Sequence, residues 1–216
     1  MSRRLVSVAL ALLAAGASAR VVVAAPSRPT PWTKIPAITV VSAQGDPRIA
    51  SVRKAVDFWN RAFADFGTPF RLGQVTLVTG SVPDRDVQDV GDQLLGGRLS
   101  APPVSMVRFP GDLVVILSDA SFISYTARWR GRVVIAIKNG NVPPLTLPNV
   151  LRNVIAHELG HSVGLEHNED ATLLMCGRPA PCRPDAFRSE TPWFFPLSAP
   201  ERARWLAMYS REWPAR

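Results

Sequence analysis

One stretch of eleven residues has the residue types and the spacing for metal chemistry. It runs from His157 to His167 and reads His-Glu-Leu-Gly-His-Ser-Val-Gly-Leu-Glu-His. His157 and His161 are four residues apart, so on a helix both imidazoles project from one face toward the same point. Glu158 lies beside the first histidine and can reach a water molecule held there. Three histidines and a water would complete a tetrahedral zinc site with one open position.

Gly164 lies between the second and the third histidine of this stretch. It follows His161 by three residues, where the helix must end and the chain must turn sharply. Glycine adopts the positive φ that such a turn usually needs, and the turn would bring His167 back as a third ligand. The chain has three histidines and all of them lie in this stretch, which argues against an ordinary amphipathic helix that carries histidine by chance.

The eleven residues resemble the zinc-binding consensus of the metzincin metalloproteases. Those enzymes carry a methionine turn downstream, and Leu173–Met175 is similar to it, with Met175 eight residues after His167 as in the matrixin branch. The resemblance implies that Met175 is a hydrophobic floor under the imidazoles and not a ligand. It also implies that Glu158 activates a zinc-bound water, directs it at a peptide carbonyl and passes the proton to the leaving amine.

The motif and the resemblance together predict an exported zinc-dependent endopeptidase with one catalytic zinc and a protein or peptide substrate. Two alternatives stay open. The first is a zinc-binding adhesin or binding module without turnover, against which the intact Glu158 argues. The second is an amidase that acts on cell-wall peptides, which a basic surface would tolerate.

The elements that position the motif can be predicted from apolar spacing. The metal helix should begin near Thr146–Pro148 and run to about Val163, with apolar residues on two sides, which is typical of a central, buried helix. Asp46 and Pro47 should open an earlier amphipathic helix that Gly67 ends. Apolar runs predict four strands, at Ile35–Val41, Val75–Thr79, Leu113–Leu117 and Arg132–Ile137.

Three further segments have local signals. Asp84–Leu95 has apolar residues at helical spacing and is predicted to be a short surface helix. Its aspartates do not match an EF-hand loop, so they are interpreted as a solvated face and calcium is left unassigned. Phe122–Trp129 is predicted to be a loop or a bulged segment. Ser198 and Glu201 form a capping box that should begin the last helix.

The resemblance implies an α+β, metzincin-like fold. Its parts would be a twisted mixed sheet with a backing helix, the central metal-binding helix, the methionine turn and a C-terminal helix. It further implies that Val133–Ile137 is the antiparallel edge strand that aligns the substrate backbone. The segment 177–196 would form the wall of the pocket that takes the side chain after the scissile bond.

The N-terminus predicts export. Residues 1–19 have a positive start, an apolar run from Leu5 to Ala15 and a small-residue cleavage site at Ala17–Ala19; a second candidate site ends at Ala25. Residues 20–34 would be an extended leader and 35–216 a single zinc-metalloprotease domain. We expect a secreted or periplasmic protein with a bacterial-type signal peptide. The alternative is an uncleaved apolar segment that anchors the protein in the membrane.

Composition limits the partners. The formal net charge is +8, but the arginines are scattered and form no basic run, so we predict no nucleic-acid binding. We expect a monomer with no stable membrane insertion after signal cleavage. The two cysteines, Cys176 and Cys182, could form a disulfide in an oxidising compartment. The alternative for Cys176 is a thiolate close to the zinc.

Overall fold

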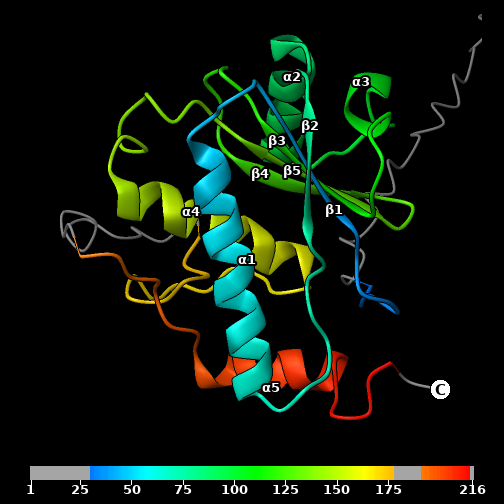
Figure 1. The fold of residues 1–216 in the computed structure, drawn as a ribbon, viewed down its shortest axis with the longest axis vertical. Coiled ribbons are helices and arrows are strands. Elements are labelled where there is room, and N and C mark those ends of the chain that lie inside the picture. Colours follow the sequence, from blue (N-terminus) through cyan, green and yellow to red (C-terminus); the bar gives the residue numbers. More distant parts are fainter. Residues whose placement is uncertain (1–29, 178–190, 215–216) are drawn as a thin grey trace, which may run out of the picture.

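A computed structural model describes residues 30–177 and 191–214 and contains a mixed five-stranded sheet (Figure 1). The strands are β1 (Ile38–Ser42), β2 (Val75–Thr79), β3 (Leu113–Leu117), β4 (Tyr125–Trp129) and β5 (Arg132–Ile137). Their order across the sheet is β2-β1-β3-β5-β4. Every neighbouring pair is parallel except β4 and β5, which are antiparallel. The sheet therefore changes direction only at its β4 edge.

Helices cover both faces of this sheet (Figure 1). On one face, α1 (Arg48–Asp65) and α4 (Pro148–Ser162) pack on a core that includes Val115 and Ile135. On the other face, α2 (Asp84–Leu95) and the short α3 (Val104–Val107) enclose a smaller core around Val114 and Val134. The alternation of neighbouring strand residues between the two cores follows from the pleat, and it explains why β3 and β5 are apolar throughout.

Three helix ends predicted from the sequence are confirmed. The Asp46 carboxylate accepts the backbone N–H of Arg48 at 2.8 Å at the start of α1, and Gly67 has a φ of 77° just after its end. The last helix, α5 (Ala199–Met208), begins at a reciprocal capping box between Ser198 and Glu201. Side-chain acceptors account for the two helix starts, and the positive φ of a glycine accounts for the end of α1.

Two expectations about the sheet edge are wrong. The segment predicted to be a loop or bulge contains strand β4, which joins β5 through a two-residue turn of Arg130 and Gly131 with φ values of 41° and 83°. Positive φ at both positions gives a type I′ turn, whose twist suits a tight hairpin. As a result, β5 lies between β3 and β4, and the antiparallel edge strand of the described residues is β4.

The first described residues are part of the packed structure. Trp32 is buried, its backbone N–H donates to the Tyr209 hydroxyl at 3.1 Å, and its indole N–H donates to the Ser162 carbonyl at 2.9 Å. The end of the predicted leader therefore packs between α4 and the C-terminal segment. No described helix is long and apolar enough to cross a membrane, and the predicted signal peptide lies outside the described residues.

Candidate metal centre

The three histidines converge on one point. Their Nε2 atoms lie 3.1 Å apart between His157 and His161, 3.0 Å between His161 and His167, and 3.2 Å between His167 and His157. Three nitrogens bound to one tetrahedral zinc at about 2.0–2.1 Å would be about 3.3–3.4 Å from each other. The spacing thus fits one face of a zinc tetrahedron, and it is the only such group of ligand side chains among the described residues.

Backbone carbonyls orient the two helix histidines. The Nδ1 atom of His157 lies 2.8 Å from the Leu174 carbonyl, and that of His161 lies 2.8 Å from the Leu165 carbonyl. Because a carbonyl only accepts, each Nδ1 carries the hydrogen and each Nε2 presents its lone pair to the shared point. Burial lowers the pKa of His161, which favours the neutral imidazole that binds metal.

Two glycines allow the third histidine to approach. Gly164 has a φ of 96°, and the N–H of Leu165 donates to the Gly160 carbonyl at 3.0 Å, so α4 ends and the chain reverses as predicted. A Cβ atom on Gly177 would lie 2.1 Å from Cγ of His167. Only glycine at position 177 leaves room for that imidazole.

The predicted methionine turn lies beneath the metal helix. Met175 is fully buried, and a Cβ atom on Gly160 would lie 2.4 Å from its sulfur, so its side chain packs tightly against α4. The Leu174 carbonyl of the same turn accepts from His157, while the Met175 carbonyl accepts the N–H of Asn168 at 2.9 Å. The backbone of the turn therefore fixes His157 directly and His167 through its neighbour Asn168.

Glu158 is buried beside the first histidine and is held by a residue that sequence reasoning did not identify. Thr126 of strand β4 has its hydroxyl oxygen 2.7 Å from Glu158 Oε2 and 2.9 Å from the Glu158 carbonyl oxygen. The sequence signal for this strand is a run of strand-forming residues from Tyr125 to Trp129, followed directly by the turn that contains Gly131.

Sequence reasoning also failed to identify two asparagines on α4. Asn149 and Asn153 precede His157 at spacings of four, so they continue the same helix row, and both are buried. Asn149 donates to the Thr191 carbonyl at 2.9 Å; Asn153 donates to the Trp193 carbonyl at 3.1 Å and accepts the N–H of Phe195 at 2.8 Å. These two asparagines therefore hold the backbone of residues 191–195 against α4 by hydrogen bonds.

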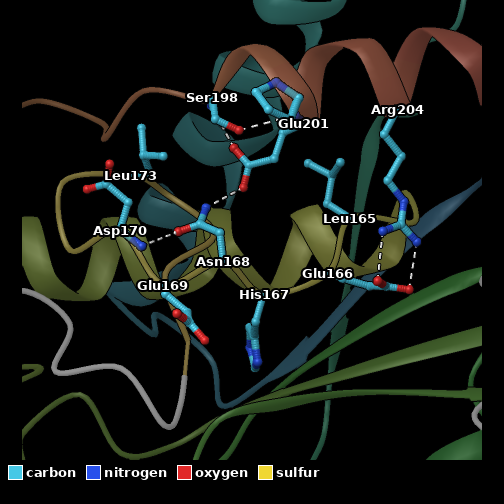
Figure 2. Close-up of a pocket in the computed structure, with 11 residues that line it drawn as sticks. Leu165, Glu166, His167, Asn168, Glu169, Asp170, Leu173, Ser198, Glu201 and Arg204 are labelled. Atoms are coloured by element: carbon cyan, nitrogen blue, oxygen red, sulfur yellow. Dashed lines mark hydrogen bonds and ion pairs between the residues drawn. The ribbon is translucent and has the colours of Figure 1, made fainter.

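The loop that carries His167 borders a cavity of about 370 Å³ next to α5 (Figure 2). Figure 2 shows the Asn168 side chain directed at Glu201, whose Oε1 accepts from Asn168 Nδ2 at 2.5 Å. Glu201 is also the capping-box acid of α5, and its Oε2 accepts the N–H of Ser198 at 2.7 Å. One buried carboxylate thus joins the start of α5 to the residue after the third histidine.

The cysteine prediction lies partly outside the described residues. Cys176 is buried directly after the methionine turn, but Cys182 falls within 178–190. The Cys176–Cys182 disulfide stays a prediction.

Comparison with known proteins gives no family assignment. No protein-family model and no curated protein matches the chain. The crystal structure of archaemetzincin from Methanopyrus kandleri is similar, with 22% sequence identity, 66% of this chain and 81% of that chain covered, and a TM-score of 0.38. Because this similarity is low, function is inferred from the site itself.

Proposed function

We propose that this protein is a zinc-dependent endopeptidase, and the observation that carries the proposal is the convergence of three Nε2 atoms on one point. His157, His161 and His167 would hold one zinc, since their spacing fits a tetrahedral face and carbonyls orient two of the rings. When bound, zinc supplies a Lewis acid that lowers the pKa of water and polarises a peptide carbonyl. Met175 stays a packing residue under the helix.

Glu158 has the position of a general base and acid. Its residue neighbour His157 belongs to the converging group, and its carboxylate is held by the Thr126 hydroxyl at 2.7 Å. It would accept the proton of the attacking water and then deliver that proton to the leaving amine. A buried carboxylate on the residue next to a converging histidine suits this transfer.

Strand β4 is the candidate edge for substrate alignment, in place of β5. Strand β4 pairs with β5 on one side. Its other side is the outer edge of the five-stranded sheet, next to α4. An extended peptide could add to such an edge by main-chain hydrogen bonds, with its scissile carbonyl close to the histidines. The backbone held by Asn149 and Asn153 would form one wall of the pocket for the following side chain.

We also propose export. The support is the charged start, apolar run and small-residue site within residues 1–19. An export signal would place the two cysteines where a disulfide is stable.

The proposal is tested by cleavage of a proteome-derived peptide library with wild type and Glu158→Ala at equal zinc content. The wild type should cleave, and the loss of the acid–base group should lower kcat by about 10²–10⁴-fold. Equal cleavage by both proteins would contradict the role of Glu158. A zinc-loaded wild type that cleaves no peptide would favour the binding-module alternative, and cleavage confined to cell-wall peptides would favour the amidase.

A further inference from the structure

The edge strand contacts the metal helix through a polar side chain. Thr126 pairs in register with Ile135, which belongs to the core between the sheet and helices α1 and α4. Thr126 therefore faces α4, and its hydroxyl oxygen lies 2.7 Å from Glu158 Oε2 and 2.9 Å from the Glu158 carbonyl oxygen. The hydroxyl thus contacts the carboxylate of Glu158 and its main chain at the same time.

A second contact shows that this position is set by the scaffold. Arg128, two residues further along β4, donates to the carbonyl of Ser162, four residues further along α4, at 2.9 Å. Two strand residues rise about 6.6–6.8 Å and four helix residues rise about 6 Å, so the two segments cover nearly the same length. The order of the two contacts indicates that β4 and α4 run in the same direction, with hydrogen bonds at Thr126–Glu158 and at Arg128–Ser162.

The chemistry of the contact assigns the direction of the hydrogen bond. A threonine hydroxyl has one proton, and both of its neighbours at Glu158 are oxygen acceptors when the carboxylate is ionised. The carboxylate is the stronger acceptor, and its oxygen is also the closer of the two. Because Glu158 is 6% exposed, its charge requires donors from the protein, and Thr126 supplies one.

We infer that Thr126 is a positioning residue for Glu158 and supports proton transfer in the chemical step. This inference rests on the proposed peptidase function. One proton moves from the attacking water to Glu158 and then to the leaving amine, while Thr126 keeps its own proton throughout. The Thr126 hydroxyl holds the carboxylate through Oε2 at 2.7 Å, and the main-chain carbonyl of Glu158 is its second neighbour at 2.9 Å.

The kinetic test uses two substitutions that separate shape from hydrogen bonding. Thr126→Val keeps the shape and removes the hydroxyl, so kcat should fall by about 10- to 100-fold with KM unchanged, since hydrogen bonds to charged groups have that effect. Thr126→Ser removes the methyl group and keeps the hydroxyl, so it should recover most of the lost kcat. Thr79→Val on the opposite edge strand β2 is the matched control and should leave kcat unchanged.

A second measurement does not depend on activity. Denaturant unfolding at fixed excess zinc compares Thr126→Val in the wild-type background with the same change in Glu158→Ala. In the wild-type background the unfolding equilibrium constant should rise about tenfold, because a hydrogen bond to a buried carboxylate is lost. In the Glu158→Ala background the increase should be smaller, since the bond to the carboxylate is already absent and only the contact with the main-chain carbonyl of residue 158 is lost.

The outcomes separate this inference from the proposed function. A kcat of Thr126→Val equal to that of wild type, or equal unfolding penalties in the two backgrounds, would overturn the role of Thr126 and leave the peptidase standing. A loss of kcat that serine fails to recover would also overturn it, because packing would then be the cause. A zinc-loaded wild type without any cleavage would overturn the peptidase itself.

Discussion

The two halves of helix α4 carry the same row of polar side chains and use it in opposite ways. In the first half, the amides of Asn149 and Asn153 donate to and accept from the backbone of 191–195. In the second half, His157 and His161 direct their Nε2 lone pairs at each other, 3.1 Å apart. Hydrogen bonds within the protein satisfy the asparagines, whereas two converging acceptors require a cation or a proton between them.

This difference shows how a structural polar row can be told from a functional one. Both pairs have a spacing of four and both lie on a buried helix, so spacing and burial do not separate them. The direction of the donors does, because the asparagine amides pair with main-chain groups of the protein, whereas the histidine pair directs two acceptors at one another. Substitutions in the two halves should therefore have effects of different kinds.

The largest effect should follow from a change in the histidine half. His161→Ala removes one of three converging nitrogens, so zinc affinity should fall by more than about 100-fold, the upper range for loss of a mere outer-shell partner. Stability in the presence of zinc should fall with it, because metal binding and folding are coupled. Chelator competition monitors the affinity, and an unchanged affinity would mean that the metal is held elsewhere.

A change in the asparagine half should cost stability and spare the metal. Asn153→Ala leaves the buried N–H of Phe195 without its acceptor at 2.8 Å, so the free energy of unfolding should fall by about 3 kcal/mol. Zinc affinity should stay within about threefold of wild type if the two halves act separately. Denaturant unfolding and chelator competition measure the two quantities.

Asn60→Ala is the matched control for that change. Asn60 on α1 holds the backbone of Leu72 by two hydrogen bonds of 2.8 and 3.0 Å, far in sequence from the segment 191–195. Both alanine variants should lose stability, but only Asn153→Ala should change which peptides are cleaved, because Asn153, unlike Asn60, holds the proposed pocket wall. Identical cleavage preferences for Asn153→Ala and wild type would contradict the proposal that the backbone of 191–195 forms a wall of the substrate pocket.

A smaller effect is expected where the histidine half of α4 packs against the methionine turn. Gly160→Ala would place a Cβ atom 2.4 Å from the Met175 sulfur and 3.1 Å from Trp59, and such overpacking costs about 2 kcal/mol. Gly96→Ala, where the nearest contact is an ordinary 3.5 Å, is the control in the same fold. Thermal unfolding compares the two, and equal midpoints would show that Met175 moves aside freely.

Much of this site could be predicted because it is encoded locally. The spacing from His157 to His167, the turn at Gly164 and the capping box of Ser198 and Glu201 depend on residues close together in the chain. Strands with strong apolar runs, such as Leu113–Leu117, were also placed correctly. In each case the physical cause acts within a few residues, so one sequence suffices to predict it.

The rest depends on partners that the sequence does not place side by side. Strand β4 has a half-polar pattern, and only its pairing with β5 and the turn at Gly131 make it an edge strand. The role of Asn153 has no local sequence signal, because two of its partners, Trp193 and Phe195, are 40 residues or more away. Such long-range hydrogen bonds decide which polar residues are structural.

The central claim is that three histidines hold one zinc ion, and anomalous diffraction at the zinc absorption edge from crystals of the purified protein tests it most directly. The account predicts one strong anomalous peak, about 2.0–2.1 Å from the Nε2 atoms of His157, His161 and His167. A zinc-replete crystal without a peak at that point, or with its main peak at other side chains, would contradict it.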